Sequence, residues 1–363
     1  MGFFLAFILC VGLLAELLSL YAGMKKIRFQ YRPKKEQAEQ GEEIPVSIEV
    51  SNTGIMPVTY LMSKSHFPKA AQLPKNVTVE EDQFQQTVNM VFRMWGRQKR
   101  TRTVNISIEK RGVHYFRGAM LERTDFLGLR KVWDFYDQQE QILVYPRCLE
   151  NQSLISAMGE YFGDLVARQH LLRDPVLTVG VREYTGAEPM KTISWSQSAR
   201  RNQLMVREFD FTRDLSCTVL LAVDGMMPTH AERLDNCCNI VRTVCQELVD
   251  RQVNVEFYTN SPKEGFGAKN RTMWKCTATA GNQMDLLRGL AFLYPGPANC
   301  SGEIMAVSAA RAAGHKTAFV VVAPFDNERI RNMVQTLEEY SGMRALLVLE
   351  SDYFDHRVEG GAV

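Results

Sequence analysis

The 363-residue sequence lacks the motifs that mark the commonest catalytic centres. It has no Gly-x-x-x-x-Gly-Lys phosphate loop, no His-Glu-x-x-His metal motif and no Gly-x-Ser-x-Gly nucleophile elbow. Its six histidines are dispersed along the chain. These absences argue against a nucleotide hydrolase, a zinc protease and a serine hydrolase, and no cofactor is expected.

An excess of charge of one sign is also lacking. The 43 basic and 41 acidic residues leave a net charge of +2, so nucleic acid is not expected as a partner. Hydrophobic residues make up 45% and charged residues 23% of the chain, which excludes a disordered chain, a collagen and a polytopic membrane protein. The length suits about two to three domains.

Paired cysteine motifs are missing as well. None of the eight cysteines has Cys-x-x-Cys spacing, and Cys237, Cys238 and Cys245 share one predicted helix without a neighbouring histidine. A structural zinc site needs about four closely spaced ligands. The pattern therefore predicts buried, reduced thiols in a reducing compartment. A cysteine hydrolase assembled in space around Cys237 or Cys300 remains an alternative.

The N-terminus carries a long apolar run. Residues 2–23 are apolar except for Glu16, Ser19 and Tyr21, and at ~1.5 Å per residue they span roughly 33 Å as a helix, enough for a ~30 Å bilayer core. Nothing basic precedes the run, which argues against a signal peptide. Six Lys and Arg residues lie between positions 25 and 35, so the positive-inside rule puts this flank in the cytoplasm.

These features predict a single-pass protein of the cell membrane. Residues 1–24 form its anchor, with the lipid bilayer contacted through residues 2–23, the N-terminus outside and the soluble domains in the cytoplasm. Glu16 either pairs with a group on a partner helix or is tolerated as a neutral side chain.

Residues 25–147 read as short strands at about ten-residue spacing. The segment 44–50 alternates apolar and polar residues, as a half-buried strand does, and the turn 51–54 follows it. Further strands are predicted at 77–79, 86–95, 101–108, 111–118 and 142–146. No convincing helix interrupts them, so the region is predicted to be an all-β sandwich.

Residues 148–213 form a connecting segment in this interpretation. A helix is predicted at 152–169, and charged and aromatic residues then interleave from 180 to 209 with neither a helical nor a strand period. Two interpretations stay open. The side chains of Arg182, Glu183, Trp195, Arg200 and Arg207 either hold an irregular segment together through ion pairs, or they form a surface that binds an acidic partner.

Residues 214–363 alternate between apolar strands and amphipathic helices. Strands are predicted at 216–224, 253–258, 271–278, 317–322 and 344–349, and helices at 230–251, 283–293, 301–313 and 327–340. This alternation predicts a doubly wound α/β sheet. Ligands bind such sheets at the carboxyl ends of the strands, where Asp224 and Asp326 are expected.

The stretch 180–209 resembles the signature of the bacterial family named domain of unknown function 58. The matching motifs are Arg182-Glu183-Tyr184, Glu188-Pro189, Ile193-Ser194-Trp195, Ser198-Ala199-Arg200 and the run from Met205 to Phe209. The resemblance covers about residues 1–350 and is strongest from 180 to 260. Two features depart from the family: the loop 125–129 lacks the usual proline, and one apolar segment stands where members commonly have two.

The resemblance implies a von Willebrand factor A-like domain over residues 214–363. Metal-binding domains of that kind carry Asp-x-Ser-x-Ser after the first strand, and here Met226 and Pro228 replace the two serines. Asp224 is kept, and Thr229 and Asp326 could supply further oxygen ligands. These three residues are weak metal candidates, and the family's metal function is not carried over.

The resulting prediction is a multidomain chain with an N-terminal transmembrane helix, an all-β sandwich and an α/β doubly wound von Willebrand A-like domain. Family members accompany MoxR-type AAA+ ATPases, so the resemblance implies a non-catalytic adaptor for such an ATPase. The expected contact residues are Arg182, Glu183, Trp195, Arg200 and Arg207. The alternatives are a metal-dependent adhesion-type module and, less favoured, a cysteine hydrolase.

Overall fold

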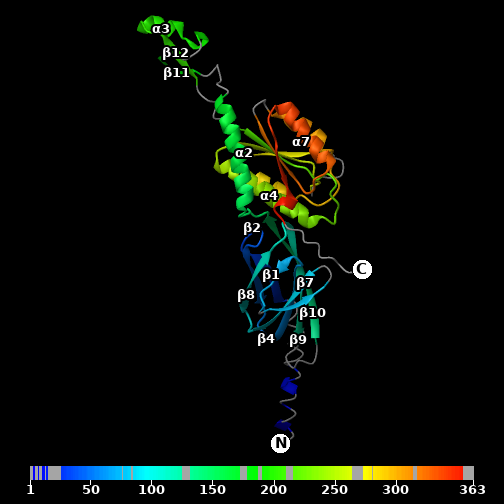
Figure 1. The fold of residues 1–363 in the computed structure, drawn as a ribbon. Helices are drawn as coiled ribbons and strands as arrows, with labels where there is room; N and C mark the ends of the chain where they lie inside the picture. Colours follow the sequence, from blue (N-terminus) through cyan, green and yellow to red (C-terminus); the bar gives the residue numbers. More distant parts are fainter. Residues whose placement is uncertain are drawn as a thin grey trace. The chain divides into compact units, whose positions relative to one another are not determined.

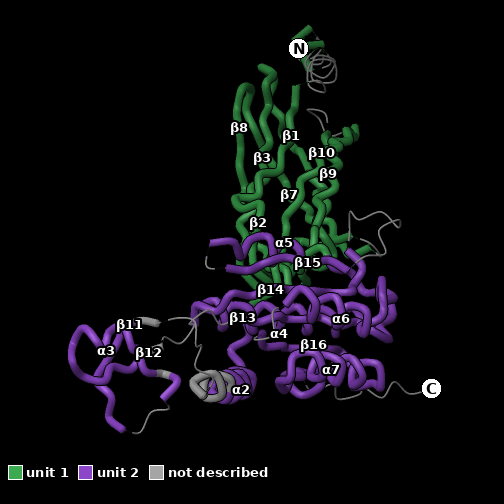
Figure 2. The backbone as a smooth tube through the Cα atoms, turned by 90° about the horizontal axis from the view of Figure 1, so that it is seen from above, with its two compact units in different colours: residues 1–147, 290–292 green, residues 148–289, 293–363 purple. Residues whose placement is uncertain are grey.

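The computed structural model, drawn in Figure 1, describes most of the chain beyond residue 25. The described residues are 3–4, 7, 10–12, 14, 26–75, 77–82, 85–124, 131–171, 178–186, 190–209, 216–263, 273–279, 281–313 and 317–354. The chain divides into two compact units, coloured separately in Figure 2. Unit 1 comprises residues 1–147 and 290–292, and unit 2 comprises residues 148–289 and 293–363.

The described part of unit 1 is a β-sandwich. One sheet has the strand order β1-β3-β8-β5 and the other β2-β10-β9-β4-β7-β6. The strands are β1 (Ile27–Pro33), β2 (Gln37–Glu39), β3 (Glu43–Asn52), β4 (Val58–Pro68), β5 (Ala71–Gln72), β6 (Thr78–Glu81), β7 (Gln85–Met94), β8 (Lys99–Ile108), β9 (Gly112–Thr124) and β10 (Lys131–Tyr145). Alternate residues of β1 and β7 point inward, and side chains of both sheets share one buried core.

A bulge interrupts the pairing of β9 with β10. The register shifts between Tyr136 and Gln139, opposite Gly118, whose φ of 74° lies in the left-handed region. The hydroxyl of Tyr31 donates to the Gly118 carbonyl at 2.7 Å. The Tyr31 ring packs edge-on against Phe67 and tilted against Phe116, with ring centroids 6.0 and 5.6 Å away. The hydrogen bond from Tyr31 thus connects this bulge to the aromatic centre of the core.

Unit 2 contains a five-stranded sheet of order β15-β14-β13-β16-β17. Its strands are β13 (Ser216–Leu221), β14 (Asn254–Thr259), β15 (Trp274–Ala278), β16 (Ala318–Ala323) and β17 (Leu346–Leu349). Neighbouring strands run parallel except β15, which runs antiparallel to β14. Every residue of β16 is buried, as expected for a strand covered on both faces.

Helices cover both faces of this sheet (Figure 1). Along the chain after β10, the described helices are α2 (Gln152–Leu171), α3 (Trp195–Arg201), α4 (Ala231–Asp250), α5 (Met284–Ala291), α6 (Gly302–Ala312) and α7 (Glu328–Ser341), with the short turns η2 (Met190–Thr192) and η3 (Glu350–Asp352). Side chains of α6 and α7 share one buried cluster with β13 and β16. The face of α4 that carries Cys237, Val241 and Cys245 is buried.

The predicted fold class is wrong, although the β-sandwich that it included is confirmed for unit 1. It required a membrane-spanning helix, and among the described residues no helix is both long and apolar enough to cross a bilayer. Most of the predicted anchor, residues 2–23, lies outside the described residues.

The prediction for the C-terminal domain also needs correction. The sheet of unit 2 is mixed, because its edge strand β15 runs antiparallel, as the edge strands of many doubly wound sheets do. The more specific prediction of a von Willebrand factor A-like core is not shown by this sheet. Strand direction depends on how the chain returns to the sheet, which the apolar pattern at 271–278 does not record. Strands dominate the described chain, with two sheets in unit 1 and two more in unit 2.

Candidate functional site

Residues 178–209 are here called the signature segment, and its described residues, 178–186 and 190–209, contain a strand, a short helix and a second strand. The strands β11 (Thr178–Glu183) and β12 (Met205–Phe209) pair antiparallel, with Arg182 opposite Val206 and Glu183 opposite Met205. Asn202 ends α3 in the left-handed conformation, at φ 51°. The interleaved sequence predicted an irregular segment, and the structure instead shows regular elements too short to display their periods.

Part of the motif serves the segment's own packing. The Ser198 hydroxyl donates to the Ser194 carbonyl and accepts the Met205 amide N–H, both at 2.8 Å. The Ser194 amide donates to the Met205 carbonyl, also at 2.8 Å. Ile193, Ser194, Ser198, Met205 and Val206 are all buried. These residues connect α3 to β12 and thereby account for Ser198, Met205 and Val206 of the motif.

Several other motif residues are exposed to solvent. Trp195 is 62% exposed, and Arg182, Glu183 and Arg200 are exposed. The Arg182 guanidinium donates to the Glu183 carbonyl at 3.3 Å. Within the described part of the chain, the side chains of Glu183 and Arg200 make no ion pair. Arg207 lies in β12, and its side chain falls outside what the structure describes.

Two exposed residues of the segment were missed from the sequence. Met190 is 68% exposed in η2, and Leu204 is 47% exposed just before β12. The backbone connects them to the motif, because the Leu204 carbonyl accepts the Tyr184 amide and the Met190 carbonyl accepts the Ile193 amide. With Trp195, the segment presents three large apolar side chains to solvent. The available signal was an apolar residue close to a turn-forming one, since Met190 follows Pro189 and Leu204 lies two residues after Asn202.

Two of the weak metal candidates are engaged by other groups, and the third is exposed. Asp224 follows β13 and is 2% exposed, and its two carboxylate oxygens accept the Asn260 side-chain amide at 2.8 Å and the Gly302 backbone amide at 3.2 Å. Asp326 is held by a bidentate ion pair with Arg331, at 2.8 and 2.6 Å, which keeps the pKa of its carboxyl low. Thr229 is exposed. Among the described residues, no three His, Cys, Asp or Glu side chains are grouped to hold a metal ion.

A buried charge at the same end of the sheet was not anticipated. Glu350, directly after β17, is fully buried and accepts the Asn236 side-chain amide at 2.7 Å. The Arg233 guanidinium lies 3.7 Å from it, donates to the Pro324 carbonyl and stacks 4.8 Å from the centre of the Phe325 ring. These contacts join α4 to the ends of β16 and β17. Their partners lie more than 90 residues apart in sequence, which explains why no local motif marks them.

The cysteines of unit 2 give the hydrolase alternative little support. Cys217, Cys237, Cys238 and Cys245 are buried. Burial raises the pKa of the Cys217 and Cys245 thiols, raises that of Cys276 to about 12, and also raises that of Cys300. A catalytic cysteine needs a lowered pKa, because the thiolate is the nucleophile.

We expect these thiols to resist mild alkylation. At pH 8, Cys276 should carry roughly a thousandfold less thiolate than an ordinary exposed cysteine, since its pKa is raised, and its reaction should accelerate as the pH rises. The exposed Cys148 serves as the internal reference. Iodoacetamide labelling followed by peptide mass spectrometry measures each rate. Faster labelling of Cys237 or Cys300 than of Cys148 would revive the hydrolase alternative.

No family model matches the chain. The uncharacterized protein YeaD of Bacillus subtilis is 23% identical to it over 219 residues, which cover 60% of this chain and 52% of YeaD. The chain therefore spans about half the length of that curated relative.

Similar solved structures match about a third of the chain. A non-cellulosomal cohesin from Archaeoglobus fulgidus is 15% identical, and the match covers 33% of this chain and 91% of the cohesin with a TM-score of 0.25. The CARDB domain of a Pyrococcus furiosus protein is 10% identical, and the match covers 32% of this chain and 91% of that domain with a TM-score of 0.22. Similarities at these TM-scores carry no argument about what the chain does.

Proposed function

We propose that the chain is a non-catalytic interaction protein that binds its partner through the signature segment. The observation that carries the proposal is the exposure of Trp195, Met190 and Leu204 on a small, hydrogen-bonded substructure that also exposes arginines. Large exposed apolar side chains on a rigid element are typical of protein contact sites. Tryptophan and arginine are the residues that most often dominate binding energy at such sites.

The arrangement separates residues that build the segment from residues that it offers to a partner. Ser194 and Ser198 form their hydrogen bonds within the segment. Trp195, next to Ser194, and Arg200, two residues after Ser198, are exposed to solvent. The exposed arginines Arg182, Arg200 and Arg201 suit a partner surface with carboxylates around an apolar pocket. Arg207 belongs to the proposed contact set by its place in β12.

The partner that we propose is a MoxR-type AAA+ ATPase. Support for this class comes from the resemblance of residues 182–209 to the family signature, since members of that family accompany such ATPases. The proposed role is that of an adaptor, which positions the ATPase without performing chemistry of its own.

We expect Trp195→Ala and Arg200→Glu each to reduce partner capture at least tenfold. Truncating a central aromatic residue at a protein interface typically costs about 2 kcal/mol or more, and reversing a charge adds repulsion from an acidic partner. The measurement is quantitative mass spectrometry of proteins retained by the tagged full chain from a native extract, with and without ATP.

The matched control is Ile304→Ala, which removes an apolar side chain of similar exposure, 58%, from α6. Circular dichroism and thermal unfolding establish that all three variants remain folded. An ATPase that is retained equally by the wild type and the Trp195 and Arg200 variants would contradict the proposed contact surface.

A further inference from the structure

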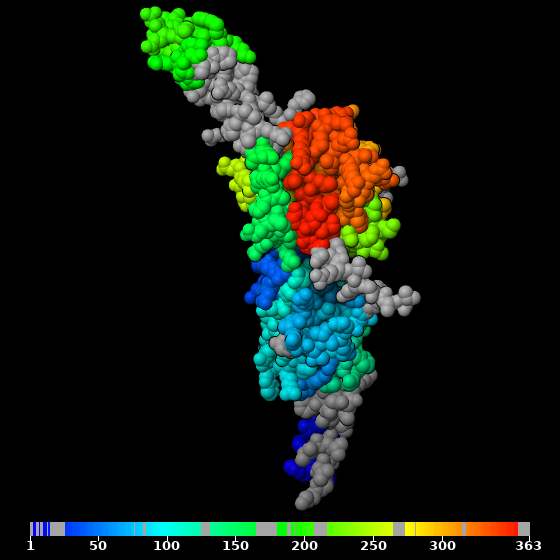
Figure 3. All heavy atoms as spheres, viewed as in Figure 1, coloured from blue at the N-terminus to red at the C-terminus, as the bar shows by residue number. Residues whose placement is uncertain are grey.

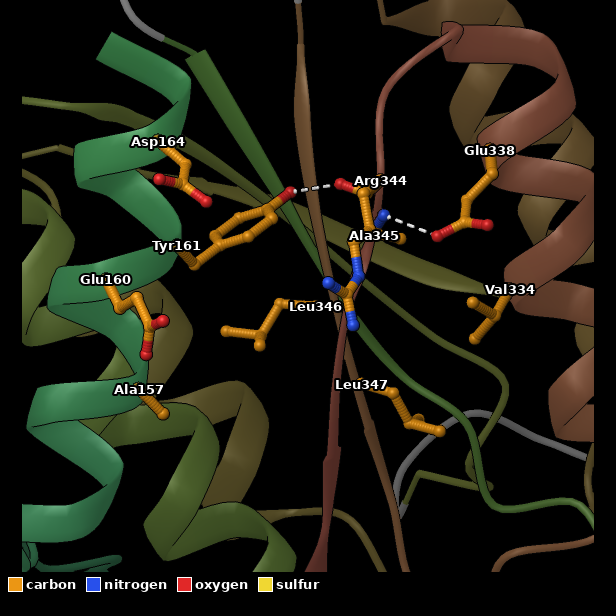
Figure 4. A pocket seen from close by; sticks show the side chains of 10 residues that line it. All are labelled: Ala157, Glu160, Tyr161, Asp164, Val334, Glu338, Arg344, Ala345, Leu346 and Leu347. Carbon is orange, nitrogen blue, oxygen red and sulfur yellow. Dashed lines mark hydrogen bonds between the residues drawn. The ribbon is translucent and has the colours of Figure 1, made fainter. Parts of the chain in front are cut away.

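A groove of about 470 Å³ follows the edge strand β17. In Figure 3 the green surface of α2 lies beside the red surface of the segment that contains β17. Figure 4 shows the groove from close by, with α2 on one side of the strand and α7 on the other. Among the described strands, β17 pairs only with β16, so its outer side has no strand partner. Alternate residues of an edge strand direct their amide and carbonyl groups outward, where they are available to another strand.

One end of the groove is closed by Tyr161. Its hydroxyl donates to the Arg344 carbonyl at 2.9 Å and accepts the Phe319 amide N–H at 3.3 Å. Burial raises the pKa of Tyr161, so the hydroxyl stays protonated and able to donate. The side chain therefore occupies the space between β16 and β17 just before their pairing begins, and it fixes α2 beside the sheet edge.

The wall formed by α2 is acidic. Ala157, Glu160, Tyr161 and Asp164 are spaced three, four and seven residues apart, which puts them on one helix face, and Figure 4 shows this face turned towards the strand. Glu160 and Asp164 are exposed and make no ion pair within the described part of the chain. Their carboxylates are thus available to a cation.

The opposite wall and the strand itself complete the groove. On α7, Glu338 accepts the Ala345 amide N–H at 3.0 Å, and Val334 adds an apolar contact. The half-buried Leu346 and Leu347 add apolar surface on the two sides of the strand, Leu346 towards α2 and Leu347 towards α7 (Figure 4). Among the described residues that line the groove, Arg344 is the one base against three carboxylates, so this lining carries net negative charge.

We propose that this groove binds an extended, basic segment of another protein, which adds to the sheet as a strand beside β17. Strand addition uses the outward backbone groups for affinity and the flanking side chains for selection. A lysine or arginine on the segment would meet Glu160 and Asp164, and apolar residues would cover Leu346 and Leu347. A second copy of this chain is disfavoured as the occupant, because it would bring the same carboxylates together. The proposal does not depend on the signature segment.

The test uses the full chain and two labelled peptides. One is a capped eight-residue peptide that alternates valine with lysine, and the other has glutamate in place of lysine. Fluorescence anisotropy measures affinity, and hydrogen exchange locates binding. We expect the lysine peptide to bind at least tenfold more tightly than the glutamate peptide and to protect the amides of residues 346–349. Backbone N-methylation on one edge of the lysine peptide should abolish binding.

Variants of the wall separate a specific contact from general attraction. We expect the double variant Glu160→Gln, Asp164→Asn to bind the lysine peptide about tenfold more weakly than the wild type. The charge-matched control, Glu303→Gln combined with Glu339→Gln, should bind it with unchanged affinity. The proposal would be overturned if both peptides bound with equal affinity, or if both double variants lost the same affinity for the lysine peptide. It would also be overturned if the peptide protected backbone amides elsewhere and not those of β17. Self-association that protects residues 346–349 without peptide would overturn it too, in favour of a second copy as the occupant.

Discussion

Replacing Asp224 by alanine is expected to lower the free energy of unfolding of unit 2 by about 3–4 kcal/mol. The Asp224 carboxylate is buried and accepts one hydrogen bond from the Asn260 side chain and one from the Gly302 backbone amide. Alanine leaves the buried Gly302 N–H without an acceptor, and water has little access to compensate. Hydrogen bonds to a charged acceptor contribute about 1.5–3 kcal/mol each, which sets the scale of the loss.

The contacts around Asp224 explain why the effect extends across unit 2. Asn260 follows β14, and besides Asp224 it contacts the Val223 amide and the Cys300 carbonyl. Asn327, the N-cap of α7, donates to the Asp224 carbonyl. A Cβ on Gly302 would lie 2.8 Å from the Asp224 carboxylate, so the start of α6 packs directly on it. Asp224 therefore links the strand ends to the beginnings of two helices.

Hydrogen exchange of amides in β13 and β14 measures this loss for unit 2 alone, which avoids assuming that both units unfold together. Asp326→Ala is the control, because the exposed ion pair of Asp326 with Arg331 should contribute nothing measurable to the free energy of unfolding. Adding Mg²⁺ should leave the free energy of unfolding unchanged, both in the wild type and in Asp224→Ala. Stabilisation of the wild type by Mg²⁺ that Asp224→Ala abolishes would favour the metal-dependent adhesion-type module instead.

The substitution Gly118→Ala should destabilise unit 1 by about 3 kcal/mol or more, because it combines backbone strain with a steric clash. Gly118 has φ 74°, and a Cβ there would lie 2.1 Å from the Tyr136 carbonyl oxygen. Relief would have to move β10 at its bulge or break the hydrogen bond from Tyr31 to the Gly118 carbonyl. Either movement disturbs the aromatic centre of the sandwich.

A second glycine isolates the steric contribution. Gly41 also has a positive φ, 79°, but a Cβ there would meet only the flexible end of the Glu109 side chain at 3.4 Å. Gly41→Ala should therefore cost only about 1 kcal/mol, the strain of the left-handed conformation. Hydrogen exchange of β9 and β10 amides compares the two variants. Equal destabilisation by both would show that the contact with Tyr136 is not decisive.

The strands of the sandwich could be predicted where one face is buried. Residues 44–50 alternate in sequence, and β3 has its buried side chains in the same region. The first half of β10 was missed, because Asp134 and Asp137 break the expected apolar pattern and only pairing with β9 makes that segment a strand. The bulge beside Tyr136 also depends on the pairing of β10 with β9, so no local sequence motif predicts the bulge.

For the candidate sites, too, some features could be predicted from the sequence and others could not. Asp224 and Asp326 do follow β13 and β16, since apolar strands with acids at their ends are visible in sequence. Their separate roles are not visible, because they depend on Asn260, Gly302 and Arg331, whose side-chain positions only the fold determines. The groove beside β17 was not foreseen, since it requires Tyr161 of α2 to reach strands that lie more than 150 residues later.

Site-specific photo-crosslinking tests the central claim most directly. A photoreactive amino acid replaces Trp195 in the full chain in living cells, and Ile304 is replaced in the same way as the control. The account predicts one specific crosslinked protein at position 195, identified by mass spectrometry as an AAA+ ATPase, and none of it at position 304. Crosslinks to that partner at 304 and not at 195, or no specific crosslink at 195, would contradict binding through the signature segment.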